Sequence, residues 1–149
     1  MALCHLLKAN SDALQLSRCL CVELGCGCAG SGLFAARYAA SVALTDGDAA
    51  ALLLAERSAA LNAAPAALSF LPLAWGSADL GAALPQLARR HESVLVLGAD
   101  LLYYRAGVFD LVASIAALLA LPLALGRAGA PQLARWGAAR DPESWEMGM

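Results

Sequence analysis

A cluster of glycines that follows directly on an apolar run is the feature that most constrains this chain. In the stretch VELGCGCAGSG, residues 22–32, four of the last eight residues are glycine. Glycine adopts left-handed backbone conformations easily and lets another group approach the backbone closely. A glycine turn that links a buried strand to a helix is typical of ligand-binding α/β proteins. The sequence therefore predicts a strand, a ligand-binding turn and a helix in this region.

Strands and helices alternate along the rest of the chain. We expect strands over residues 19–24, 42–45, 68–75, 93–99 and 121–125, and helices over residues 33–40, 48–61, 80–91 and 106–119. This alternation predicts an α/β fold, with a doubly wound, mostly parallel sheet of about five strands and helices on both faces. Ligands of such sheets bind at the carboxyl ends of the strands, near the point where the strand order reverses.

Length and charge limit the classes of protein. The 149 residues suffice for one domain, which we assign to residues 1–126, followed by an irregular tail over residues 127–149. The net charge of -2 gives no broad basic surface, so we expect no nucleic-acid partner. The longest apolar run, residues 108–126, contains Asp110 and Pro122 and falls short of the roughly twenty apolar residues that cross a bilayer. We therefore expect no membrane partner.

Targeting signals and cysteines indicate the compartment. The first residues show no basic segment ahead of a long apolar one, so we expect no secretion and a cytoplasmic location, with the nucleus as the alternative. The five cysteines are an odd number, as expected of reduced thiols. Cys19, Cys21, Cys26 and Cys28 form two C-x-C pairs, whereas paired zinc cysteines usually have two to four residues between them, so we expect no metal.

The glycine turn fits two kinds of nucleotide ligand. Gly25, Gly27 and Gly30 satisfy the pattern G-x-G-x-x-G, and Asp46 lies about twenty residues further on, as in dinucleotide-binding proteins. However, a carboxylate at the end of the second strand can accept hydrogen bonds from any pair of ribose hydroxyls. A nicotinamide dinucleotide and the adenosine of a methyl donor therefore both remain open at this point.

Glu23 and Trp75 favour the methyl donor. Glu23 lies directly before the turn, where it would repel a pyrophosphate and attract an ammonium or sulfonium group. Trp75 ends the third predicted strand and offers a flat apolar surface for an adenine ring. The structural alternatives are an edge charge for Glu23, a helix cap for Asp46 or Asp48, and a core position for Trp75.

Four segments resemble a known family when they are taken together. VELGCGCAGSG, LTDGD, LAWGS and LGADLLYY occur in this order between residues 20 and 119. The chain is similar here to the seven-strand S-adenosylmethionine-dependent methyltransferases of the methyltransferase-like protein-lysine group. The resemblance implies a Rossmann-like fold, S-adenosyl-L-methionine as the cofactor, and a protein substrate that presents a lysine for methylation.

The resemblance also implies two sets of site residues. Those that border the donor are Glu23, Gly25, Gly27, Asp46, Trp75 and Ala99. Asp100 and Tyr103 are the catalytic residues implied, as the D-x-x-Y signature beside the acceptor. Their spacing of three would let both point from one helical turn toward the same amine. The alternative for Tyr103 is simple packing.

The chain also departs from the family. We expect the last two antiparallel strands and the N-terminal hairpin to be missing, as in a methyltransferase truncated at both ends. An uncovered sheet edge would follow, and with it association of the chain through that edge. The alternative functions are a non-catalytic or truncated donor-binding module, a small-molecule methyltransferase and an NAD-dependent oxidoreductase fragment.

Overall fold

The structure is a computed structural model that describes residues 2–62, 66–76, 83–102 and 107–124. The strands are β1 (Cys19–Glu23), β2 (Ser41–Asp46), β3 (Ala67–Pro72) and β4 (Ser93–Leu97). The helices are α1 (Ala2–Ala9), α2 (Gly30–Ala35), α3 (Ala49–Asn62), α4 (Ala83–Ala88) and α5 (Val108–Ala124), with a short 3-10 helix η1 (Leu16–Arg18) before β1.

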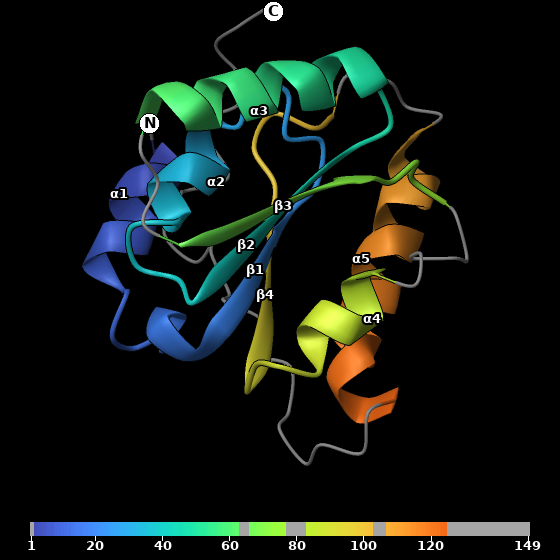
Figure 1. Cartoon of the computed structure of the whole chain (residues 1–149). Helices are drawn as coiled ribbons and strands as arrows, with labels where there is room; N and C mark the ends of the chain where they lie inside the picture. The colour runs from blue at the N-terminus through green and yellow to red at the C-terminus, as the bar shows by residue number, and fades with distance from the viewer. Residues whose placement is uncertain (1, 63–65, 77–82, 103–106, 125–149) are drawn as a thin grey trace, which may run out of the picture.

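The strands form one parallel sheet in the order β3-β2-β1-β4 (Figure 1). From β1 the chain moves outward through β2 to β3 and then returns to place β4 on the other side of β1. The strand order therefore reverses at β1, and the carboxyl ends of β1 and β4 flank the point where α/β proteins bind ligands. The predicted α/β class with a Rossmann-like parallel sheet is confirmed.

Helices cover both faces of the sheet and form two separate cores. Cys21 of β1 packs in a cluster with Leu7 of α1 and Ala35 of α2, to which α3 also contributes. Leu20 and Val22 of the same strand face the opposite way, into a cluster with α4 and α5. Figure 1 shows α1, α2 and α3 on one side of the sheet and α4 and α5 on the other. This alternation along β1 is what a doubly wound sheet requires.

Local sequence signals explain two of the helix boundaries. Asp48 caps α3, because its Oδ1 accepts a hydrogen bond of 2.8 Å from the backbone N–H of Ala50. Pro85 is the third residue of α4, in the first turn, where a missing N–H leaves no helical hydrogen bond unmade. Of the helix expected over residues 80–91, the described residues show the short α4.

The prediction of a strand over residues 121–125 is wrong for residues 121–124, which the structure describes. Helix α5 continues through Ala124, because the run of alanine and leucine has high helix propensity and no residue before Pro122 stops it. Leu121 is buried in the core that α4 and α5 share. The last strand described is therefore β4. No described helix, α5 included, combines the length and hydropathy needed to cross a bilayer.

Candidate functional site

The glycine turn follows β1 at the carboxyl edge of the sheet. Gly25 and Gly27 both have left-handed backbones, with φ of +59° and +50°. The N–H of Gly27 donates a hydrogen bond of 3.0 Å to Oδ2 of Asp46. A Cβ atom added to Gly27 would meet no atom within 4 Å. Open space therefore lies over this glycine, as a ligand that approaches the backbone closely requires.

Asp46 joins two turns at the ends of neighbouring strands. Its Oδ2 holds Gly27, and its Oδ1 accepts a hydrogen bond of 3.0 Å from the N–H of Asp48. Since an ionised carboxylate offers about four acceptor positions, these bonds leave capacity for ligand hydroxyls. The side chain that caps α3 is Asp48. Asp46 thus ties the glycine turn to the turn after β2 and does not cap α3.

Glu23 lies beneath the glycine turn. Its side chain is only 2% exposed. Oε1 accepts a hydrogen bond from the hydroxyl of Ser31, and Oε2 accepts one of 3.0 Å from the N–H of Gly32. Burial raises the pKa of the Glu23 carboxyl and the charge of Asp46 adds to the rise, while the two hydrogen bonds oppose it. Glu23 therefore anchors the start of α2, and its contact with a donor stays a prediction.

Ser31 and Gly32 are site-forming residues that the sequence reading missed. A Cβ atom on Gly32 would overlap Cδ2 of Leu44 and Oε2 of Glu23. A Cβ atom on Gly30 would meet no atom within 4 Å. The close packing of helix on strand, which the fingerprint assigns to its third glycine, therefore depends on Gly32 and not on Gly30. The sequence signal for this close packing is Gly32 itself, a fourth glycine after the three that satisfy the pattern G-x-G-x-x-G.

Trp75 and Leu101 border the turn from two other strand ends. A Cβ atom on Gly25 would lie 2.8 Å from Cδ2 of Leu101 and 3.2 Å from Cζ2 of Trp75. The next residue, Gly76, donates its N–H to the hydroxyl of Ser114 at 3.0 Å and so ties this segment to α5. Trp75 is half-buried and also packs on the core beneath α5. The packing of Trp75 on the core agrees with the core position weighed from the sequence, and its contact with an adenine ring stays a prediction. Leu101 is a neighbour that the sequence did not indicate.

Ala99 and Asp100 follow β4 at the same edge, and both are exposed. Asp100 has a left-handed backbone, with φ of +58°, which aspartate adopts more readily than most residues. Residues 100–102 form no helical turn, so the expected display of Asp100 and Tyr103 from one turn is not seen there. Tyr103 itself lies outside the described residues. Its pairing with Asp100 stays a prediction.

The cysteines are free thiols. Cys19, Cys21 and Cys26 are buried, and Cys28 is exposed on the glycine turn. Burial raises the pKa of Cys21 and Cys26 to about 12, so both are neutral near pH 7. Over the described ranges, no group of three or more histidine, cysteine or acidic side chains could hold a metal ion.

A parallel sheet, a glycine turn after β1 and a carboxylate at the end of β2 define a Rossmann-like fold, which binds nucleotides in many proteins. Residues 1–123 match the model of the lysine methyltransferase family. The chain belongs to this family, whose chemistry is methyl transfer, and the reading as an NAD-dependent oxidoreductase is set aside. No curated protein shows a significant match to the chain.

Proposed function

We propose that this protein transfers the methyl group of S-adenosylmethionine to a lysine side chain of another protein. Membership of the lysine methyltransferase family supports methyl transfer. The observation that carries the donor half is the hydrogen bond of Asp46 to Gly27, beside open space over that glycine. A carboxylate can accept hydrogen bonds from the ribose hydroxyls, and a glycine without a side chain lets the neighbouring groups of the ligand approach the backbone.

The residues at the carboxyl edge fit the donor. Asp46 would accept hydrogen bonds from the ribose hydroxyls, Trp75 would pack against the adenine, and Gly25 and Gly27 would border the methionine part. The buried carboxyl of Glu23 adds a negative charge beneath the turn, which favours a cationic ligand. When bound, S-adenosylmethionine supplies a methyl group on a positively charged sulfur.

Asp100 is the group we propose for the acceptor. Its exposed carboxylate follows β4, the strand beside β1, and would accept a hydrogen bond from the lysine ammonium. The ammonium would have to lose a proton to solvent before its nitrogen could act as the nucleophile, and the thioether of S-adenosylhomocysteine would be the leaving group. The task of the protein is to align the amine and to exclude water from it.

The donor half is tested by calorimetric titration of the purified chain with S-adenosylhomocysteine and, separately, with NAD. We expect binding of the first and none of the second. Binding of NAD with no response to S-adenosylhomocysteine would contradict the proposal.

The acceptor half is tested with a radiolabelled methyl donor and a library of lysine-containing peptides. Label recovered as methyl-lysine after acid hydrolysis would support the lysine substrate. Asp100→Asn should abolish this transfer while donor affinity changes by less than about tenfold, or 1.4 kcal/mol. Donor binding without any transfer would instead favour the donor-binding module. Label recovered on another residue type would leave methyl transfer standing and refute lysine as the acceptor.

A further inference from the structure

Strand β4 lies at the edge of the described sheet and has the character of an interior strand. It pairs with β1 on one side and with no described strand on the other. Its sequence, SVLVL, contains no charge and no proline, although sheet edges that face water usually carry such residues. The opposite edge is different, because β3 ends in Pro72, which has no N–H to donate.

The residues of β4 are less buried than those of β1 beside them. Leu95 and Val96 lie beside Cys21 and Val22 of β1 in the sheet register. Both β1 residues are fully buried, whereas Leu95 and Val96 are only half-buried. The middle of β4 is therefore less covered than the strand beside it.

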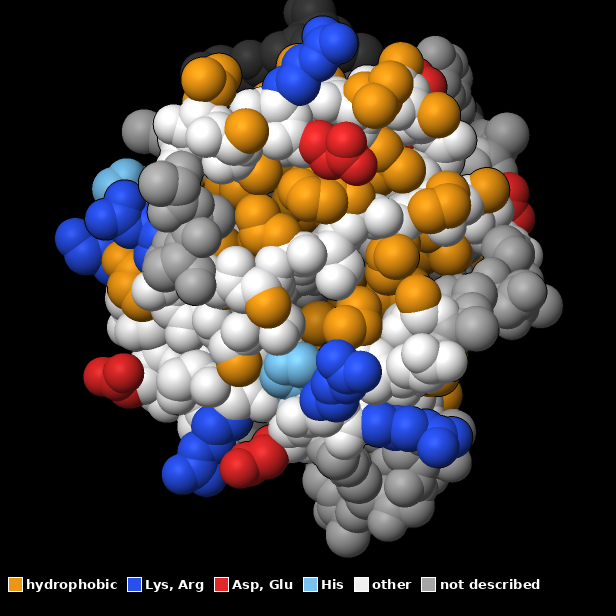
Figure 2. Space-filling model, viewed as in Figure 1, with side chains coloured by type: hydrophobic (Ala, Val, Ile, Leu, Met, Phe, Trp, Pro, Cys, Tyr) orange, Lys and Arg blue, Asp and Glu red, His pale blue; other side chains and the backbone are white. Residues whose placement is uncertain are grey.

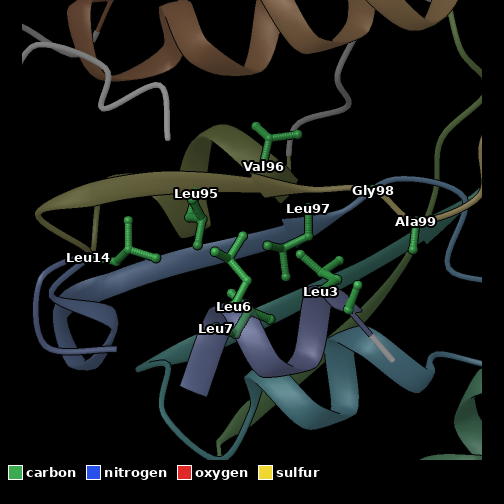
Figure 3. Close-up of a pocket in the computed structure, with 10 residues that line it drawn as sticks. Leu3, Leu6, Leu7, Leu14, Leu95, Val96, Leu97, Gly98 and Ala99 are labelled. Carbon is green, nitrogen blue, oxygen red and sulfur yellow. The ribbon is translucent and has the colours of Figure 1, made fainter. Parts of the chain in front are cut away.

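An apolar groove runs along the same strand. It has a volume of about 510 Å³ and lies between α1 and residues 95–99. In Figure 3, Leu95 and Leu97 point toward Leu3 and Leu6 of α1, while Val96 points to the opposite face of the sheet. Side chains of a neighbouring strand would therefore find apolar surface beside β4.

The backbone of β4 shows how such a neighbour could pair. The carbonyl of Leu97 accepts a hydrogen bond of 2.9 Å from the N–H of Leu24, so it points toward β1. Since successive residues of a strand direct their backbone groups to opposite sides, Val94 and Val96 direct theirs toward the open edge. Suppose that Leu95 faced Leu95 of a second, antiparallel copy. Val94 of each copy would then face Val96 of the other, and the two residues would exchange both backbone N–H···O=C hydrogen bonds.

The charges at the two ends of β4 are opposite. Arg90 precedes the strand, and Arg18 reaches Glu92 there at 3.2 Å. Figure 2 shows Lys and Arg side chains gathered with a histidine at the lower end of the molecule, where Figure 1 shows β4 beginning. Asp100 follows the other end of the strand. Antiparallel pairing centred on Leu95 would bring the Arg90 end of one copy against the Asp100 end of the other.

We propose that two copies of this protein associate through β4, as an antiparallel strand pair centred on Leu95 that joins their sheets across a two-fold axis. Closed two-fold symmetry pairs the same edge of both copies and leaves neither β4 open. This inference does not depend on methyl transfer.

Sedimentation velocity of the full chain over a concentration series tests the proposal, and we expect a reversible monomer–dimer equilibrium. Arg90→Glu should weaken dimerisation at least about tenfold, because it places two acids together at both ends of the strand pair. The double variant Arg90→Glu/Asp100→Arg should restore it, because the charges are exchanged. The control is Arg57→Glu, the same charge change at an exposed position on α3, which should leave the dimer unchanged.

Hydrogen exchange supplies a second readout that does not depend on any substitution. The amides of Val94 and Val96 should become protected as the concentration rises. Strong protection of both amides in a monomer would mean that another part of the chain covers the edge, and would overturn the proposal. A monomer at every concentration, or an equal effect of Arg57→Glu and Arg90→Glu, would also overturn it.

Discussion

At the scale of single residues, two carboxylates in the turn after β2 have different tasks. Asp46 holds Gly27 at the proposed donor site, and Asp48 caps α3. We predict that Asp46→Ala weakens binding of S-adenosylhomocysteine by roughly 1 to 3 kcal/mol, the scale of a lost charge-assisted hydrogen bond. Asp48→Ala is the matched control and should lower the free energy of unfolding by about 1 kcal/mol with unchanged affinity. Calorimetry and urea denaturation measure both, and an equal loss of affinity in the two variants would contradict this division.

The raised pKa of Glu23 gives a prediction for the pH dependence of stability. Because the folded pKa lies above the unfolded one, the stabilisation linked to this group is fully present below the unfolded pKa. It is lost as the pH rises through the folded pKa. Glu23→Gln removes the titration, so the free energy of unfolding of the wild type minus that of the variant should fall over this window. Urea denaturation from about pH 4 upward measures this difference. If the free energies of unfolding of the two proteins changed in parallel with pH, the raised pKa of Glu23 would be contradicted.

The sequence indicated that the glycine turn and the carboxylate after β2 lie close together. The N–H of Gly27 donates a hydrogen bond to Asp46, as the spacing of the fingerprint suggests, while the contact of both residues with a donor stays a prediction. Ser31 and Leu101 were missed, because a serine in a glycine turn and a leucine after a strand have no distinctive spacing. Their importance comes from contacts with Glu23 and Gly25, which only the folded chain brings about.

At the scale of elements, the packing of α2 on the sheet depends on Gly32. We predict that Gly32→Ala destabilises the protein by about 1 to 3 kcal/mol, because the added Cβ would overlap Leu44 and Glu23 in the interior. The Cβ atom that Gly30→Ala adds in the same helix would meet no atom within 4 Å, so this substitution should stabilise the protein by about 0.5 to 1 kcal/mol. Thermal or urea unfolding compares the two variants, and similar effects would show that the packing of α2 adapts.

The predicted elements were most accurate where apolar runs are bounded by clear stop signals. The strands β1 and β2 end at Glu23 and Asp46, and β4 ends directly before Gly98, so their apolar runs stand out in the sequence. The run at residues 121–125 is apolar but follows another apolar run directly. Periodicity alone does not separate a short buried strand from the end of a buried helix, and α5 continues into it.

At the scale of the whole molecule, donor binding should stabilise the folded state. A ligand that binds only the folded chain adds about 2.7 kcal/mol at a concentration one hundred times its dissociation constant. We therefore predict that S-adenosylhomocysteine raises the midpoint of thermal unfolding in a concentration-dependent way. Gly27→Val should lose most of this increase, because its side chain would occupy the open space at the turn. An equal increase in the variant would place the donor elsewhere.

The hydrogen bond between Asp46 and Gly27 also bears on the kinetics of donor binding. Because this bond joins the turns after β1 and β2 within the free protein, two walls of the proposed site are assembled before a donor arrives. Little conformational entropy then remains to be lost there on binding. Association should therefore be similar for related nucleosides, and differences in their affinity should arise from dissociation rates. The residence time of a donor would then report directly on its contacts with this edge of the sheet.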